Sequence, residues 1–99
     1  MDAHPAFPWV IFINYRVFQE MKIEVRLFSY FCDLLGKREN RCSFSMETKD
    51  GLTCGDLLTT LNISLELPMV ILVNGSVKGK GYMLEEGDVV SILPPVEGG

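Results

Sequence analysis

The stretch of the sequence best suited to chemistry is its last seven residues, Leu93-Pro94-Pro95-Val96-Glu97-Gly98-Gly99. An apolar, strand-like segment leads into two prolines, whose fixed φ and missing N–H should stop the strand and project the chain outward in an extended form. The four residues that follow can reach about 13 Å, at about 3.3 Å each. Gly98 and Gly99 have no Cβ, so their backbone can enter a channel too narrow for other residues.

The carboxylate of Gly99 is the candidate reactive group. Its pKa lies near 3.5 in model peptides, so it is ionised at pH 7. A carboxylate is a poor electrophile, but it can attack the α-phosphate of a nucleotide, and adenylation would make it an activated acyl group. The alternative is a frayed end without function, which is common at chain termini. The Pro-Pro exit immediately before the glycines favours the reactive interpretation.

The segment Ile92-Leu93-Pro94-Pro95-Val96-Glu97-Gly98-Gly99 resembles the C-terminus of the MoaD/ThiS sulfur-carrier proteins, most closely the small subunit of molybdopterin synthase. The resemblance extends back to Met21 and implies a ubiquitin-like β-grasp fold. It also implies that an ATP-using adenylyltransferase of the ubiquitin-activating type adenylates Gly99. A persulfide sulfur then displaces AMP, and the resulting thiocarboxylate delivers sulfur to a pterin precursor on a large subunit. In this cycle Gly99 and Gly98 are the catalytic positions, and the chain itself binds no cofactor.

The resemblance further implies a docking surface near the tail. Phe28, Val77 and Leu93 stand where the family has exposed apolar residues, and Pro94, Pro95 and Val96 complete the expected partner contacts. Alternation along the predicted strands independently assigns Phe28 and Leu93 to outward faces. An apolar patch rimmed by polar residues is typical of a partner site. Scattered surface apolar residues, which need no function, are the alternative.

Composition and charge restrict the other classes of function. Ninety-nine residues, 47% of them hydrophobic and 22% charged, fit one globular domain. A net charge of −4 disfavours nucleic acid as the main partner. No apolar run reaches the roughly 18 residues of a membrane span. We expect a cytoplasmic protein, because an odd number of cysteines without paired spacing is typical of reduced thiols. The three cysteines, Cys32, Cys42 and Cys54, lack C-x-x-C spacing, so they predict neither a disulfide framework nor a zinc site.

A catalytic constellation is not apparent in the sequence. The sole histidine, His4, precedes the domain, so a Ser-His or Cys-His pair would have no base within it. Gly79-Lys80-Gly81 is too short for a phosphate loop. The acidic turn around Glu85, Glu86 and Asp88 is read as solvated rather than metal-binding. We therefore expect a sulfur-donating subunit on which other proteins act, rather than a complete enzyme.

The remaining pattern predicts an α+β fold, with a mixed sheet of four to five strands and one main helix packed on one face. Residues 22–28 and 41–47 alternate as half-buried strands, and residues 69–73 form an apolar run typical of a strand covered on both faces. The final strand runs up to Leu93, and a crossover helix should place the first and last strands side by side and parallel.

Local signals place the helices and turns. Ser29 is expected to cap a short helix with Phe31, Leu34 and Leu35 on one face and Gly36 at its stop. Thr53-x-x-Asp56 matches the capping box of the main helix, in which Leu57, Leu58 and Leu61 share a side. Asn74-Gly75 is a tight hairpin signal, and residues 77–84 are typical of an irregular edge strand and loop.

Residues 1–20 differ from the domain at 21–99 in period and composition. Two interpretations are open for this extension: a mis-assigned start or dispensable segment, and a genuine edge strand or partner-binding arm.

Alternatives to the molybdopterin role are a tungsten-cofactor counterpart, a carrier for thiazole or tRNA thiolation, and a ubiquitin-like modifier. A non-reactive β-grasp interaction module is the alternative of another class.

Overall fold

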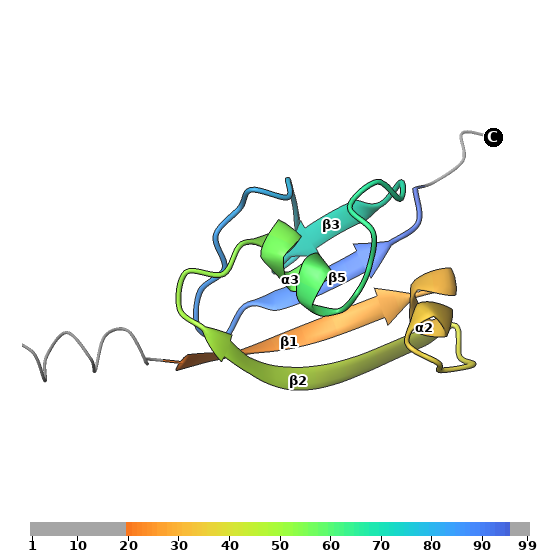
Figure 1. Ribbon diagram of the computed structural model, residues 1–99, viewed down its shortest axis with the longest axis horizontal. Coiled ribbons are helices and arrows are strands. Elements are labelled where there is room, and N and C mark those ends of the chain that lie inside the picture. Colours follow the sequence, from red (N-terminus) through yellow and green to blue (C-terminus); the bar gives the residue numbers. More distant parts are fainter. Residues whose placement is uncertain (1–19, 96–99) are drawn as a thin grey trace, which may run out of the picture.

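The structure is a computed structural model that describes residues 20–95. Its elements follow the order predicted from the sequence (Figure 1): β1 (Glu20–Phe28), α2 (Tyr30–Leu34), β2 (Arg41–Lys49), α3 (Cys54–Thr60), β3 (Val70–Val73), β4 (Ser76–Lys78) and β5 (Val89–Leu93). The predicted N-terminal extension lies outside the described residues except for Glu20, with which β1 begins.

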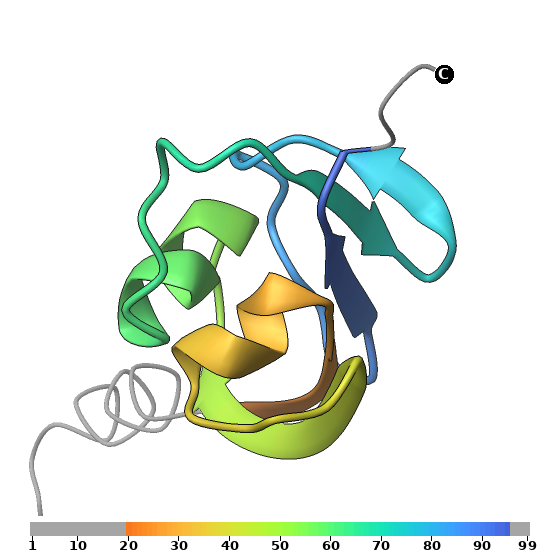
Figure 2. The same ribbon diagram turned by 90° about the vertical axis from the view of Figure 1, so that its right-hand side faces the viewer.

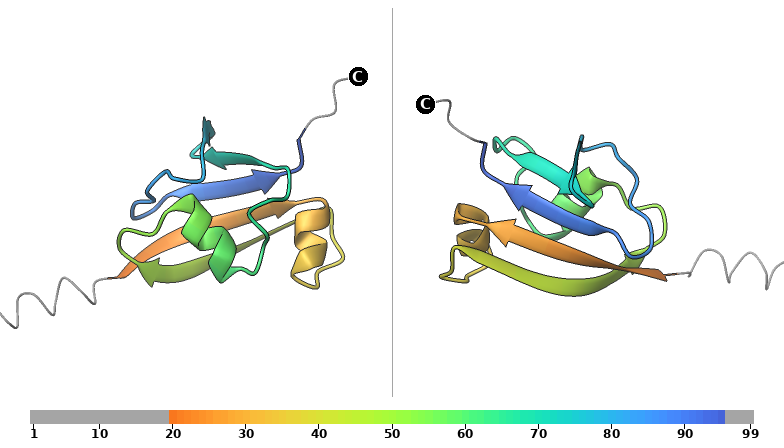
Figure 3. Two further views of the ribbon diagram at one scale, coloured as in Figure 1. Left: turned by 45° about the horizontal axis from the view of Figure 1, so that its top comes forward. Right: turned by 180° about the vertical axis from the view of Figure 1, so that it is seen from behind.

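The five strands form one mixed sheet in the order β2-β1-β5-β3-β4. β1 and β5 pair in parallel at its centre, and the other neighbours are antiparallel (Figure 3). The connection from β2 to β3 runs through α3, which is the crossover expected of a ubiquitin-like β-grasp. Because β1 and β5 are parallel, the residues that end them lie at the same end of the sheet.

Both helices cover the same, concave face of the curved sheet (Figure 2). Alternation along β1 turns four apolar side chains to that face, and β5 adds two. The helices supply most of the rest, so that a single apolar core fills the space between the layers. Its fully buried side chains include Ile23, Val25, Leu27, Phe31, Leu57, Leu58, Val90 and Ile92.

The main helix begins as its sequence predicts. The Thr53 hydroxyl accepts the backbone N–H of Asp56 at 3.0 Å, and the Asp56 carboxylate accepts that of Thr53 at 3.1 Å. This reciprocal capping box satisfies two of the donors that a helix N-terminus leaves free. The Asn74-Gly75 hairpin is also confirmed, since both residues have positive φ, at 54° and 88°. That is the backbone of the tight turn whose twist matches the flanking strands.

Three local expectations are wrong. Ser29 makes no side-chain cap of α2; its φ is 61°, and its N–H bonds to the carbonyl of Asn40 instead. Leu34 does not join Phe31 in the core but is 50% exposed, because a five-residue helix meets the sheet only along one narrow line. The run at 69–73 is not covered on both faces either: Ile71 and Val73 are buried, whereas its other residues are only half-buried.

Candidate functional site

The tail leaves the body at the end of β5. Leu93 is the last residue of that strand, Pro94 is half-buried and Pro95 is exposed. The predicted positions Val96, Gly98 and Gly99 lie outside the described residues. The parallel register aligns Leu27 with Ile92, so Phe28 and Leu93 are the next pair along and lie side by side where the tail begins.

The face of the sheet opposite the helices carries an apolar patch, formed by Phe28, Val70, Leu72, Val77 and Leu93. Strand pairing makes these residues neighbours: Val70 lies opposite Leu93, and Leu72 lies opposite Val77. Within residues 20–95 no helix or loop element covers this face (Figure 3, right). Val77 is 73% exposed, and the other four are half-buried. The structure thus brings the three residues predicted for docking onto one face beside the tail.

Phe28 was expected to be an exposed aromatic residue, yet it is half-buried. In the sheet it stands between Arg41 on β2 and the position of Leu93 on β5. Val70 and Leu72 were missed as site residues because the continuous apolar run around them indicated a strand covered on both faces. The sequence did hold a usable signal: a sheet with helices on only one side must leave alternate residues of every strand on the open face.

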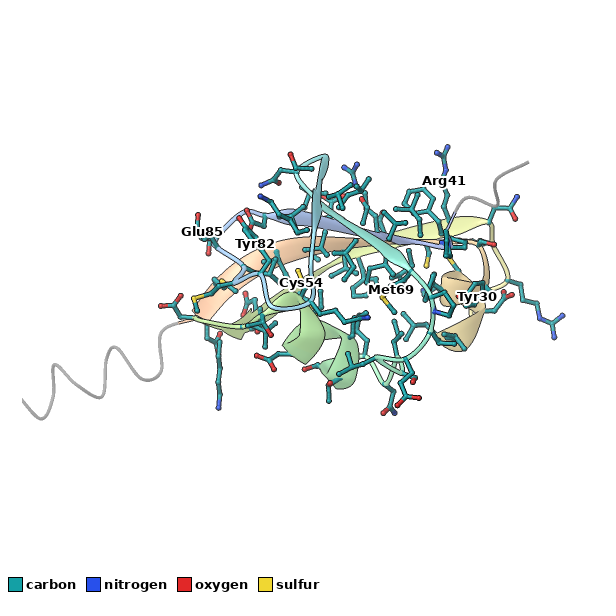
Figure 4. All side chains as sticks on the ribbon, turned by 90° about the horizontal axis from the view of Figure 1, so that it is seen from above. Tyr30, Arg41, Cys54, Met69, Tyr82 and Glu85 are labelled. Carbon is teal, nitrogen blue, oxygen red and sulfur yellow. The ribbon has the colours of Figure 1, made fainter. Side chains whose placement is uncertain are left out.

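Polar side chains border the apolar patch towards β2. On β1, the Arg26 Nε atom donates to a Glu24 carboxylate oxygen at 2.7 Å. On β2, Arg41 lies opposite Phe28 in the antiparallel register. Figure 4 shows the Arg41 side chain extending from the sheet on the side away from the helices. The patch is therefore apolar at its centre and charged at its β2 end, as in many protein interfaces.

The buried thiols are poorly suited to act as nucleophiles. Burial raises the pKa of the Cys32 thiol to about 12, and this thiol donates to the carbonyl of Leu27 at 3.1 Å. Burial also raises the pKa of Cys54, with a further contribution from the nearby Asp88 carboxylate. The thiolate is the reactive form of cysteine, and it is scarce at neutral pH in both positions. Cys42 is half-buried on β2.

The acidic turn belongs to the framework at the opposite end of β5. Asp88, only 6% exposed, accepts hydrogen bonds from the Asn74 side-chain amide at 2.9 Å and the Glu85 N–H at 2.8 Å. Glu86 accepts the Lys22 N–H at 2.9 Å. These contacts tie the β3–β4 turn and the start of β1 to the start of β5, away from the tail.

The described residues contain neither a metal-binding cluster nor a helix that could span a membrane. Among residues 20–95, no three His, Cys, Asp or Glu side chains cluster in a way that could hold a metal ion. No helix in this range is long and apolar enough to cross a membrane.

Comparison with known proteins identifies the family. The family model for the ThiS family matches residues 25–99. Small archaeal modifier protein 3 of Haloferax volcanii is 29% identical in an alignment that covers 80% of this chain and all of that protein. A Pyrococcus furiosus protein assigned as molybdopterin converting factor, subunit 1, superposes with a TM-score of 0.63 at 26% identity, covering 77% of this chain and 99% of that one.

A third similarity is to a chain in the Helicobacter pylori complex of subunits 1 and 2 of molybdopterin-converting factor. Its TM-score is 0.52 at 26% identity, and the match covers 80% of this chain and all of that chain. The match to the ThiS family model includes the C-terminal tail and most of the sheet. The sheet and the Gly-Gly terminus are thus matched by one and the same family model. The chain belongs to the ThiS family and is a ubiquitin-like sulfur carrier or modifier of the ThiS and MoaD type.

Proposed function

We propose that this protein is the sulfur-donating small subunit of a molybdopterin synthase, and that its Gly99 carboxylate carries the sulfur. The observation that supports this most is the course of β5. The strand ends beside the apolar patch and continues directly into Pro94-Pro95-Val96-Glu97-Gly98-Gly99. The segment that leads to Gly99 and the apolar patch that we assign to a partner thus begin at the same end of the sheet.

The chemistry proceeds in two stages on an adenylyltransferase of the ubiquitin-activating type. The Gly99 carboxylate attacks the α-phosphate of ATP, which releases pyrophosphate and leaves an acyl adenylate. A persulfide sulfur then attacks the acyl carbon, and AMP departs. A second thiol cleaves the new S–S bond, so that one disulfide forms and the carrier retains a thiocarboxylate. This chain supplies the acyl group, while its partners supply the nucleotide and the catalytic side chains.

In this proposal the domain has a second role, which is to hold the tail in the partner's active site. Four residues beyond Pro95 reach about 13 Å, so the partner must bind the body close to its own reaction centre. The apolar patch provides a surface for that contact, because burying Phe28 and Leu93 against a partner would remove apolar area from water. Support for a large-subunit partner comes from the similar Helicobacter pylori chain, which is seen in a complex of subunits 1 and 2.

A ubiquitin-like modifier is the second candidate, favoured by the 29% identity to a small archaeal modifier protein. Both functions begin with the same acyl adenylate. They diverge when the acceptor is either a persulfide sulfur or the amine of a lysine side chain on another protein. Both candidate functions require docking on a partner, and the apolar patch could provide the contact in either case. The two candidates therefore differ in the covalent product formed at Gly99 and not in the docking surface.

Intact-mass measurement distinguishes these functions. The chain is incubated with its activating enzyme, ATP and a persulfide donor, and then with the large subunit and the pterin precursor. The proposal predicts a mass gain equal to the replacement of one oxygen by sulfur, and loss of that gain as the pterin acquires sulfur. Covalent lysine conjugates without sulfur delivery would favour the modifier. An unchanged mass under all conditions would exclude both and leave the non-reactive interaction module.

A further inference from the structure

A groove lies at the β2 end of the apolar patch, on the open face of the sheet. Its volume is about 400 Å³, and it is lined by Glu24, Arg26, Phe28, Arg41, Cys42 and Ser43. The cross-strand register explains this grouping, since Phe28 lies opposite Arg41 and Arg26 lies opposite Ser43. Phe28 belongs to both the groove and the apolar patch, so the two surfaces are continuous.

The groove is locally cationic on an acidic protein. The chain as a whole has a net charge of −4, yet the groove holds two guanidinium groups and one carboxylate. A Glu24 carboxylate oxygen accepts a hydrogen bond from the Arg26 Nε–H, with 2.7 Å between the oxygen and Nε. Within residues 20–95, Arg41 forms no ion pair, and it is exposed. The Arg41 guanidinium, unpaired within the described residues, and the remaining donors of Arg26 thus line the same space.

We propose that this groove binds a single carboxylate side chain, Asp or Glu, of the protein that docks on the apolar patch. This inference rests on the proposed function only for the identity of that partner. One excess positive charge matches one carboxylate, which a planar guanidinium can bind through two parallel hydrogen bonds. The ring of Phe28 provides an apolar wall for the methylene groups of the acidic side chain.

A phosphate group fits the groove less well. Glu24 already stands among the lining residues, and its negative charge repels a doubly charged anion more strongly than a singly charged one. Arg26 also has its Nε–H engaged by this carboxylate, so its guanidinium charge is already partly compensated and only Arg41 carries a charge not offset within the groove. The groove therefore favours a carboxylate that approaches as part of a larger protein surface.

The position of the groove gives the ion pair an orienting role. Apolar burial is non-directional, so the patch alone would tolerate several rotations of the partner. Arg41 stands two strands from Leu93, at about 4.8 Å per strand, and hence about 10 Å from the root of the tail. Val77 lies at the other end of the patch, on the edge strand β4. A charge contact at one end fixes the rotation that delivers the tail to the reaction centre, as complementary charges do in other interfaces.

The test compares two arginine variants in binding to the large subunit, measured by calorimetry at low and high NaCl concentration. Arg41→Gln should weaken binding about fivefold at low salt and reduce the salt dependence of the affinity, since a partly desolvated ion pair is lost. Arg38→Gln is the matched control. It removes the same charge three residues away, from an exposed residue that does not line the groove, and should change the affinity little. Equal effects of both variants would overturn the proposal, because they would show only a general dependence on charge.

A second measurement is independent of the partner. Full-length protein is titrated with a short acetylated glutamate peptide, the matching glutamine peptide and inorganic phosphate, and the arginine Nε–H resonances are followed by NMR. The glutamate peptide alone should shift the Arg41 signal, and Arg41→Gln should abolish the accompanying shifts of Phe28 and Ser43. A stronger response to phosphate, or none to glutamate, would overturn the groove proposal. Absence of large-subunit binding by the wild-type protein, with the glutamate response intact, would overturn the proposed function instead.

Discussion

Replacing Thr53 by alanine tests how the main helix is held in place. The hydroxyl of Thr53 accepts the Asp56 N–H at 3.0 Å, and the substitution removes this acceptor while the Asp56 carboxylate can still bind the backbone at position 53. Loss of a threonine N-cap costs about 1 kcal/mol in typical helices. For a domain of this size, that lowers Tm by about 4–8 °C. Thermal unfolding followed by circular dichroism measures the change.

The same helix offers a control of identical chemistry. The Thr60 hydroxyl donates to the carbonyl of Asp56 at 2.9 Å within α3, and its residue is exposed. Thr60→Ala should leave stability unchanged or raise it slightly, because alanine has the higher helix propensity and the carbonyl keeps access to water. Thr53→Ser should retain the cap and most of the stability. If Thr53→Ala and Thr60→Ala shift Tm equally, the capping box does not stabilise the start of α3.

Three further outcomes are expected. Phe28→Ala and Leu93→Ala should each weaken large-subunit binding by roughly 1–3 kcal/mol with little change in Tm, and normal binding by both in calorimetry would place the docking surface elsewhere. A chain that begins at Met21 should keep the Tm of the full protein, whereas a fall of several degrees would show that the extension packs on the body. Cys32, whose raised pKa of about 12 keeps it protonated, should react with iodoacetamide at pH 8 far more slowly in the folded protein than in denaturant, and rapid labelling in the folded state would contradict its burial.

The sheet could be predicted from the sequence because alternation is a strong signal where one face is buried. Residues 22–28 and 41–47 show a period of two, and the structure confirms both as parts of β1 and β2. The capping box at Thr53 and the Asn74-Gly75 turn are equally local signals, since each depends on bonds or dihedral angles within four residues. The parallel pairing of β1 and β5 then follows from the crossover through α3.

The errors arose where tertiary contacts decide the outcome. Helix α2 has five residues, too few for its period to show which side meets the core, and Leu34 was placed inside although it is half-exposed. Ser29 is held by Asn40, which is eleven residues away in sequence. Val70 and Leu72 joined the candidate site only when the pairing of β3 with β5 placed them beside Leu93. The groove at Arg41 likewise depends on cross-strand register, which the spacing of charges along one strand does not reveal.

Deletion of Gly99 tests whether the carboxylate of this residue accepts sulfur. Deletion shortens the reach of the tail by about 3.5 Å and withdraws the carboxylate from the nucleotide. The measurement is the intact mass of wild-type and shortened chains after incubation with the activating enzyme, ATP and a persulfide donor. We predict that the wild type gains the mass of a thiocarboxylate, that the shortened chain gains none, and that both have the same Tm. A sulfur mass gain by the shortened chain would show that sulfur attachment does not require Gly99.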